Sequence, residues 1–472
     1  MVSNVVAATH VEIGGDVYGD LARLDAEGFL PGSLLSMKPL NRMEVMRLLL
    51  EAESSPPPDG TNARATLRRL REQFPKETGE ILYIKPLDRA RASYTYLNSE
   101  SQALNYNNSG YEYQEGSNFR VDVATRAEWS RVSGYARPEF RLSDGGGTFT
   151  LRTVYASVEA LGVELTAGRE PLWWGPGHHG ALLISNNAEP ITMLNLTNPT
   201  AVLLPWIFRF LGPFRFDFFA GRLEDDRQDV GNPILWGLRF DMKPLPCLEI
   251  GVERTVIFGG EGHDEGWSGW WRSFTARGEN DPGKDRGDQK AGVDIKVTIP
   301  WKVQPVQLYA EVAGEDSAGW EPSRRGYIGG IYLPRIPGSD RVDFRSEFAY
   351  NHVSQEPNYW YNHYIYTQGY TYKGRIIGHH MGTDSRDIFV AASILVSPLL
   401  EKISAYYDRE EHNLSFPVRE TKDEIGVGVT LRPRSDVDLK VFYRNARVEN
   451  LGNVPGASEN LSQVSAEVQY AF

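Results

Sequence analysis

Residues 423–444 read DEIGVGVTLRPRSDVDLKVFYR and carry the clearest structural signal in the chain. Apolar side chains occupy every second position on both sides of a central connector, at Ile425, Val427, Val429 and Leu431, and at Val437, Leu439, Val441 and Tyr443. A period of two places them on one face of an extended strand. The Arg-Pro-Arg-Ser connector contains residues typical of turns. The stretch therefore predicts two antiparallel strands joined by a short turn.

The same alternation recurs from about residue 85 onward, as in three further runs: Phe119, Val121 and Val123; Phe214, Phe216 and Phe218; and Val293, Ile295 and Val297. Roughly 16 to 18 such runs have about 8–11 residues, the length that a tilted strand needs to cross a bilayer. Short turns alternate with long polar connectors, as they do in outer-membrane barrels. Charged side chains oppose the apolar face, and a water-filled lumen would solvate them. We therefore predict an all-β transmembrane β-barrel of about 18 antiparallel strands over residues 85–472.

The final run of the chain supports this prediction. Its alternation continues to the last residue, with apolar side chains at Val464, Ala466, Val468, Tyr470 and Phe472. The terminal Phe resembles the signal by which outer-membrane barrels are recognised for insertion. The chain also holds 11 Trp, 23 Tyr and 20 Phe, which suit aromatic girdles at both membrane interfaces. A soluble all-β protein is the alternative, because its strands also alternate.

The first 84 residues have a different period and predict a small helical module. Apolar residues at helical spacing mark a first helix that ends near Gly28: Val17, Leu21 and Leu24. Asn41 is positioned to cap a second helix, with Glu44 three residues later as in a capping box. A third amphipathic segment covers residues 62–74. Such a module is too small to bury a large core alone, so we expect residues 1–84 to dock on the barrel.

Composition excludes several classes of protein. The net charge is −12 at pH 7, and no block of Lys and Arg resembles a nucleic-acid footprint. Polar residues and Pro interrupt the longest uncharged stretch, residues 190–208, so no transmembrane helix is predicted. Cys247 is the only cysteine, which excludes an internal disulfide and a thiolate metal cluster. The N-terminus shows no signal-peptide pattern, so the chain is either cytosolic or has lost its signal peptide.

Residues 168–190 read GREPLWWGPGHHGALLISNNAEP and resemble the signature of the capsule assembly protein Wzi family. Residues 18–31, YGDLARLDAEGFLP, resemble the helical segment at the N-terminus of that family. The resemblance implies an outer-membrane β-barrel of a Gram-negative bacterium, with the helical module on the periplasmic side and long loops outside the cell. It also implies a lectin-like, non-catalytic role in binding and retaining capsular polysaccharide or exopolysaccharide. Surface polysaccharide and outer-membrane lipid are then the expected partners, with other envelope proteins as a further class.

The family-like signature contains a loop motif. A strand-like run leads directly into Trp173, Trp174, Gly175, Pro176 and Gly177. Glycine permits backbone angles that other residues avoid and proline fixes φ, so we interpret this segment as a rigid loop folded into the barrel mouth or lumen. The loop either packs without a ligand or helps to bind one. Asn186 and Asn187 can likewise bond to loop backbone or to a sugar hydroxyl.

Two long connectors hold the candidate carbohydrate-binding residues. The first, residues 259–288, includes Trp267, Trp270, Trp271 and Arg272. The second, residues 358–380, includes Tyr359, Trp360, Tyr361 and Tyr364. A sugar ring has an apolar C–H face and a rim of hydroxyls, so its site needs a flat aromatic face beside polar partners, and Arg suits an acidic polymer. The alternative for both sets is packing within the loops or in the interfacial aromatic belt.

The doublets His178-His179 and His379-His380 do not predict a metal site. Neighbouring residues on a strand point to opposite faces, so one doublet cannot easily chelate one ion, and no zinc-binding spacing accompanies them. The chain also contains no nucleophile elbow, P-loop or dinucleotide motif, and we predict neither a cofactor nor an enzyme. Two other functions stay open: a passive outer-membrane channel, and a secreted enzyme that acts on polysaccharide with a soluble β-fold.

Overall fold

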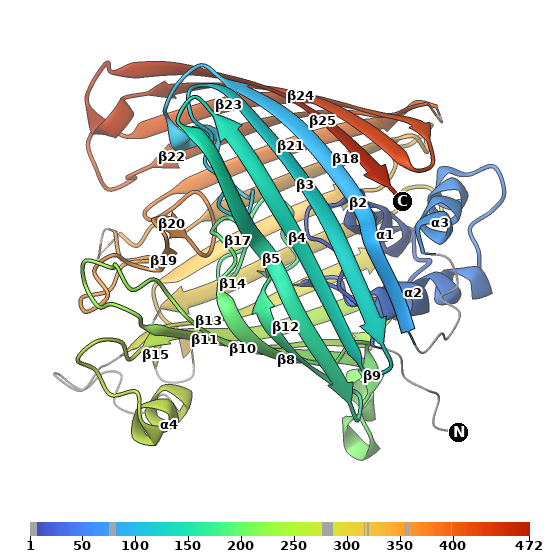
Figure 1. The fold of residues 1–472 in the computed structure, drawn as a ribbon, viewed down its shortest axis with the longest axis horizontal. Coiled ribbons are helices and arrows are strands. Elements are labelled where there is room, and N and C mark those ends of the chain that lie inside the picture. Colours follow the sequence, from blue (N-terminus) through green and yellow to red (C-terminus); the bar gives the residue numbers. More distant parts are fainter. Residues whose placement is uncertain are drawn as a thin grey trace.

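The computed structural model describes residues 7–74, 82–275, 287–315, 317–318, 321–354, 356, 358–397 and 399–472. Within these residues, 18 antiparallel strands form a closed barrel (Figure 1). The first barrel strand, β2 (Leu82–Leu97), pairs with the last, β25 (Ser458–Ala471), and this pairing closes the sheet. The predicted fold class, a β-barrel of about 18 strands with helices at the N-terminus, is confirmed.

The other barrel strands follow in chain order, each antiparallel to its neighbours: β3 (Gly116–Trp129), β4 (Val132–Ser143), β5 (Gly146–Ala160), β6 (Val163–Arg169), β8 (Thr192–Thr197), β9 (Val202–Leu203), β10 (Pro213–Arg222), β11 (Ile234–Leu245), β12 (Leu248–Phe258), β13 (Gly287–Ile299), β14 (Val306–Glu315), β17 (Arg325–Leu333), β18 (Val342–Tyr350), β21 (Arg386–Leu395), β22 (Leu400–His412), β23 (Glu420–Arg434) and β24 (Val437–Glu449). Both β8 and β9 pair with β10, so these two short strands together complete one position in the wall. Shorter elements belong to the connecting segments: β1 (Met37–Lys38), β7 (Trp173–Trp174), β15 (Ser317–Ala318), β16 (Glu321–Pro322), β19 (Thr371–Tyr372), β20 (Arg375–Ile376), η1 (Gln102–Leu104), η2 (Trp206–Leu211) and η3 (Leu451–Asn453).

The two faces of the barrel wall differ in polarity. On β23, Ile425 points outward and leaves 51% of its surface exposed, while its neighbour Glu424 points inward and is fully buried. Inward charges pair with one another across strands, as Arg239 does with Glu253 at 2.6 Å and with Asp294 at 2.7 Å. Pairing is needed because a buried charge without a partner is costly. An apolar outer face with a polar interior is the pattern of a barrel that crosses a lipid bilayer.

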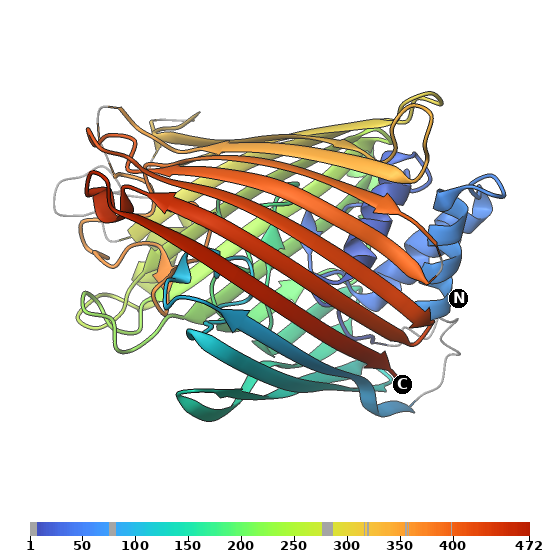
Figure 2. The same ribbon diagram turned by 90° about the horizontal axis from the view of Figure 1, so that it is seen from above.

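Three helices gather at one end of the barrel: α1 (Asp16–Ala26), α2 (Arg42–Ser54) and α3 (Asn62–Gln73) (Figures 1 and 2). The Asn41 side chain caps α2 by accepting a hydrogen bond from the N–H of Met43 at 2.9 Å. Gly28 follows α1 with a φ of +87°, a left-handed conformation that favours glycine. The predicted cap and stop are therefore confirmed. Among the described residues, no helix combines the length and the apolar character needed to cross a bilayer.

The helices share a small core and bind the barrel through polar contacts. Each contributes buried leucines to that core, among them Leu24, Leu48 and Leu67. Asp25 of α1 accepts hydrogen bonds from Lys243 at 3.2 Å and Gln307 at 2.9 Å on the barrel wall. Arg69 of α3 pairs with Glu401 at 2.8 Å. The helices are thus docked on the barrel, while the division at residue 84 stays a prediction, because residues 75–81 lie outside the described part.

The connectors at the two ends of the barrel differ in length. At the helix end, short turns join neighbouring strands, as at residues 130–131, 161–162 and 435–436. At the opposite end lie α4 (Trp267–Thr275), β19 and β20, within long connectors such as residues 351–385 (Figures 1 and 2). We call this opposite end the long-loop end. It presents the surface on which loop residues can meet a ligand.

Candidate functional site

The family-like motif loop, residues 170–191, folds into the lumen and contacts inward side chains from strands far apart around the barrel. The indole Nε1 of Trp174 donates a hydrogen bond to Asp217 of β10 at 2.9 Å. The N–H of Leu182 donates to Glu311 of β14 at 2.8 Å. Trp174 is fully buried. The motif loop therefore crosses the lumen from wall to wall.

Glycines and one carboxylate fix the path of the motif loop. Gly175 has a φ of +114°, and a Cβ on Gly177 would lie only 2.1 Å from the carbonyl oxygen of Gly180. Glu347 of β18 accepts hydrogen bonds from the N–H groups of three successive residues, 178–180, at 2.7, 3.0 and 3.1 Å. Three amides on one carboxylate hold the loop rigidly on the wall. Beside this anchor lies an inner cavity of about 480 Å³ that faces α1, with Trp173 and Pro176 in its lining.

Asn186 and Asn187 bind loop backbone. The side-chain amide of Asn186 donates to the carbonyl of Asn107 at 3.1 Å, and that of Asn187 donates to the carbonyl of Ile376 at 2.9 Å. Both asparagines are buried. They therefore join the motif loop to two other loops, and their side chains act as structural connectors.

The second aromatic connector supplies packing residues at two of its four candidate positions. Trp360 is fully buried and donates from Nε1 to the carbonyl of Arg324 at 2.8 Å. Tyr361 exposes 2% of its surface, and its hydroxyl donates to the carbonyl of Leu182 in the motif loop at 2.7 Å. Neither ring has a face open to a sugar, so the expectation that they contact a ligand is corrected to packing. Tyr359 lies under the guanidinium of Arg324 at 4.0 Å, and Tyr364 is 65% exposed.

The first aromatic connector forms α4, which presents aromatic rings to solvent. Trp267 and Trp271 leave 82% and 50% of their surface exposed. Trp270 packs against Phe258 of the wall, with ring centroids 4.9 Å apart. Arg272 is held near Asp264 at 3.6 Å. The structure therefore anchors α4 through Trp270 and leaves two indole faces available at the long-loop end.

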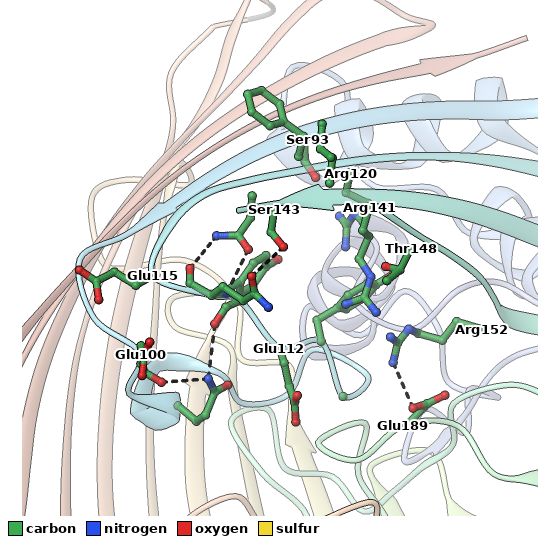
Figure 3. Close-up of a pocket in the computed structure, with 18 of the residues that line it drawn as sticks. Ser93, Glu100, Glu112, Glu115, Arg120, Arg141, Ser143, Thr148, Arg152 and Glu189 are labelled. Carbon is green, nitrogen blue, oxygen red and sulfur yellow. Dashed lines mark hydrogen bonds and ion pairs between the residues drawn. The ribbon is translucent and has the colours of Figure 1, made fainter. Parts of the chain in front are cut away.

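A cavity of about 850 Å³ opens at the long-loop end, beside the second aromatic connector. Figure 3 shows Arg120, Arg141 and Arg152, which come from the adjacent strands β3, β4 and β5, in its wall. Arg120 and Arg141 are direct partners in the register of β3 and β4. Three neighbouring strands thus place their guanidinium groups side by side in one cavity.

Tyr111 is the centre of this arginine group. Its ring lies 4.6 Å from the Arg120 guanidinium, 4.4 Å from that of Arg152 and 5.5 Å from that of Arg141. Burial raises the pKa of Tyr111, which keeps the phenol neutral, and its hydroxyl donates to Glu139. Cation–π contacts with a buried ring hold all three guanidinium groups in a fixed arrangement. The loop between β2 and β3, which carries Tyr111, therefore forms part of the cavity wall.

Donors and acceptors both face this cavity. Arg120 pairs with Glu467 at 3.3 Å, and Arg141 and Arg152 lie 3.4 Å and 3.7 Å from Glu139, while all three arginines line the cavity. The motif loop contributes Glu189, which lies 3.7 Å from Arg152 and 3.2 Å from Lys373. Acidic residues of the preceding loop, Glu112 and Glu115, are exposed at its rim. The cavity can therefore bind a ligand that has both anionic groups and hydroxyls.

This cavity was not predicted from the sequence. The alternation of Phe119 and Val121 places Arg120 on the polar side of a strand, but it does not distinguish Arg120 from the many other polar residues of the wall. The turn at residues 130–131 is short enough to set the register of β3 against β4 and to bring the first two arginines together. The contribution of Tyr111 comes from a long loop, whose path leaves no periodic signal in the sequence.

Residues 89–462 match the family model described as "Capsule assembly protein Wzi". The chain belongs to this family. The predicted membership of the Wzi family is therefore confirmed, and the matched residues include the motif loop.

Two relatives of this Wzi-family chain are informative. A protein of 55.8 kDa from the cps region of Klebsiella pneumoniae is 29% identical over 354 residues, covering 72% of this chain and 65% of that protein. The chain thus spans just under two thirds of that relative. The solved structure of Wzi from Escherichia coli, an outer membrane protein involved in group 1 capsule assembly and a carbohydrate-binding β-barrel, is 22% identical. It covers 98% of this chain and 100% of its own with a TM-score of 0.79, which shows a shared fold.

A passive channel is not favoured for this Wzi-family barrel. Side chains of the motif loop and of the second aromatic connector form one buried cluster inside the described barrel, including Leu182, Ile184, Tyr361, Tyr366 and Tyr370. The docked helices cover the other end (Figure 2). Packed side chains therefore occupy the lumen where an open pore would hold water.

Proposed function

We propose that this chain is an outer-membrane barrel that binds surface polysaccharide and retains it at the cell without catalysing a reaction. The arginine-lined cavity at the long-loop end is the observation that carries this proposal. Membership of the Wzi family supports it, as does the carbohydrate binding of the E. coli protein with the same fold. The apolar outer face fits a lipid environment.

The chemistry of the cavity favours an acidic polysaccharide. A planar guanidinium donates two parallel hydrogen bonds to a carboxylate, and Arg120, Arg141 and Arg152 offer three such groups. Glu112 and Glu115 at the rim accept hydrogen bonds from sugar hydroxyls. Each contact with one repeat unit is weak, but a polymer presents many repeats, and their effects multiply through effective concentration. Retention therefore does not need tight binding of a single sugar.

The aromatic face of α4 is a second contact surface in this proposal. Trp267 and Trp271 are exposed at the same end of the barrel as the arginine-lined cavity. An indole face packs against the C–H face of a sugar ring. Tyr364 extends the aromatic surface on the neighbouring connector.

The proposal also sets the orientation of the barrel. Polysaccharide at the cell surface requires the long-loop end to face outward, which places α1, α2 and α3 on the periplasmic side. The exposed parts of these helices are then available to other envelope proteins.

The double variant Arg120→Gln with Arg141→Gln tests the role of the cavity. We expect it to bind the polysaccharide from the source cells at least about tenfold more weakly, because each charged hydrogen bond contributes about 1.5–3 kcal/mol. The matched control is Arg447→Gln, which removes a 62% exposed arginine that pairs with Glu449 on β24. Heat-modifiable migration on gels shows that each barrel is folded. Equal binding by the double variant and the control contradicts the proposal.

A further inference from the structure

One histidine from each His-His doublet lies in the same buried cluster inside the barrel. His179 belongs to the motif loop and His380 to the segment between β20 and β21, and their ring centroids are 4.6 Å apart. Nε2 of His179 lies 3.4 Å from Oδ1 of Asp408 on β22. Asp387 on β21 lies between the two rings, with Oδ2 3.6 Å from His179 and 3.3 Å from His380. Two loops and two wall strands thus bring four metal-ligating side chains together.

The converging atoms are buried and make no hydrogen bonds. The side chains of His179, His380, Asp387 and Asp408 expose 7% of their surface or less. Within the described residues, both Nε2 atoms and all four carboxylate oxygens have no hydrogen-bond partner. Each such buried polar group costs about 1–3 kcal/mol when it stays unsatisfied. Four of these atoms, one from each side chain, lie 3.3–3.6 Å from another atom of the cluster, and this arrangement indicates a shared ligand.

The spacing of these atoms distinguishes a metal site from direct ion pairs. A charge-assisted N–H···O bond is about 2.7–2.9 Å long, whereas the nitrogen-to-oxygen distances here are 3.3–3.6 Å. Four ligands about 2.0–2.1 Å from a tetrahedral zinc ion lie about 3.3 Å from one another. His179, His380 and Asp387 place one ligand atom each within 4.8 Å of one another, and Asp408 lies 3.4 Å from His179, so these atoms are close to the second spacing.

The charges of the cluster favour a divalent cation. Asp387, Asp408 and Glu410 carry three negative charges, and Lys422, 3.5 Å from Asp408, carries one positive charge. Glu424 also pairs with Lys422, at 3.3 Å, so carboxylates outnumber the cationic side chain here and a divalent cation offsets part of that excess.

The surroundings hold both imidazole rings in place. Phe389 stacks on His179 with ring centroids 4.0 Å apart, and Tyr106 stacks on His380 at 4.4 Å. Asn107 joins the two segments, because its amide nitrogen donates to the carbonyl of His179 and lies 3.3 Å from Nδ1 of His380. Stacked aromatic rings therefore limit the movement of both imidazoles, as the residues around the ligands do in metal sites.

We propose that His179, His380, Asp387 and Asp408 bind a divalent transition-metal ion, with Zn²⁺ as the best match to two imidazole nitrogens and two carboxylates. The ion would link the motif loop and residues 377–385 to β21 and β22. It would thereby hold the two loops that lie inside the barrel against the barrel wall. The sequence did not predict this site, because each doublet supplies only one ligand and the two doublets are 200 positions apart.

Titration of Zn²⁺ into the untagged, detergent-purified barrel, after treatment with a chelator, tests the proposal. Calorimetry gives the stoichiometry and affinity, and Co²⁺ used as a second probe reports tetrahedral geometry by its visible absorption. The variants are His380→Ala and Asp408→Asn, the second of which keeps the shape of the side chain. The control is His352→Ala, because Nδ1 of His352 pairs with Asp384 at 2.6 Å outside the cluster. Heat-modifiable migration on gels identifies the folded barrels.

We expect one Zn²⁺ per wild-type barrel, a tetrahedral Co²⁺ spectrum, and at least about tenfold weaker Zn²⁺ binding in the two cluster variants but not in the control. If His380→Ala does not fold, Zn²⁺ binding by Asp408→Asn is compared with that of the wild type and the control. The absence of Zn²⁺ uptake by the wild type overturns the proposal, as does equal uptake by the wild type and the folded variants. Preference for Ca²⁺ or Mg²⁺ also overturns it, because those ions select oxygen ligands.

Discussion

His10 lies between two carboxylates where the N-terminal segment enters the barrel. Its Nε2 is 2.6 Å from Glu164 and its Nδ1 is 2.8 Å from Glu170. Burial by itself lowers the pKa of His10, but the two carboxylates outweigh that effect and raise the pKa well above its usual value of 6.5. The imidazolium therefore persists at neutral pH and ties the N-terminal segment to β6 and the motif loop.

A His10→Gln variant should lose this contact and its pH dependence. Because the pKa of His10 is raised on folding, its contribution is complete below about pH 6.5 and is lost as the pH rises through the raised value. We expect the variant to be about 2 kcal/mol less stable at about pH 6, with a difference that shrinks at alkaline pH. Heat denaturation of both proteins in detergent, from about pH 6 to alkaline pH, measures the difference in stability. The other titrating groups are the same in both proteins, so their effects cancel in that difference. A gap that stays constant with pH would count against this role.

The sequence identified aromatic loop residues that could contact a carbohydrate. It did not show which of their side chains are exposed to solvent. Trp267 and Trp360 look equivalent in the sequence, since both lie in long polar connectors among other aromatics. The structure exposes 82% of Trp267 and none of Trp360. The difference arises from contacts distant in sequence, such as the bond from Trp360 to Arg324, which no local pattern encodes.

At the level of elements, the motif loop is the part whose conformation depends most on close packing. Its path requires Gly177 to pass within contact distance of Gly180, and three successive amides to converge on Glu347. The loop also carries Glu189 to the arginine-lined cavity and His179 to the buried cluster. The motif loop is therefore a rigid element that contributes a residue to the arginine-lined cavity and a residue to the buried histidine–aspartate cluster.

A Gly177→Ala variant should displace the motif loop. The added Cβ would lie 2.1 Å from the carbonyl oxygen of Gly180, so the backbone must move at a cost of about 1–3 kcal/mol. We expect the variant to conduct more ions than the wild type in planar bilayers. Gly329→Ala on β17 is the control, because a Cβ there meets no atom within 4 Å. Equal conductance of the two variants would show that the loop tolerates the change.

Elements with strong periodic or capping signals could be predicted well. Alternation located the strands, and Asn41 and Gly28 located two helix ends, because these signals depend on a few neighbouring residues. The pairing of Arg120 with Arg141 depends on register, and the position of Tyr111 depends on the path of a long loop. Both are set by contacts between segments, which explains why the arginine-lined cavity was missed.

At the scale of the whole molecule, the barrel combines an apolar outside with an interior filled by its own loops. Its N-terminal helices lie at one end and α4 lies at the other (Figure 1), and the arginine-lined cavity opens at the same end as α4. This division suits a protein that holds a ligand at one end more than one that passes solutes through.

The wild-type barrel should be nearly silent in planar bilayers. The core that includes Tyr361, Tyr366 and Tyr370 packs against the motif loop inside the described barrel, and ions cannot pass through packed side chains. Single-channel recording beside a general porin in the same bilayer measures this. Stable conductance comparable to that of the porin would restore the channel as the better function.

Binding of the detergent-purified barrel to polysaccharide from its own source cells is the most direct test of the central claim. A neutral, unrelated polymer serves as the control, and the salt concentration is varied. The account predicts selective binding that weakens as salt rises, because guanidinium contacts to acidic sugars are screened. A folded barrel that binds neither polymer, or binds both equally at every salt concentration, would contradict the account.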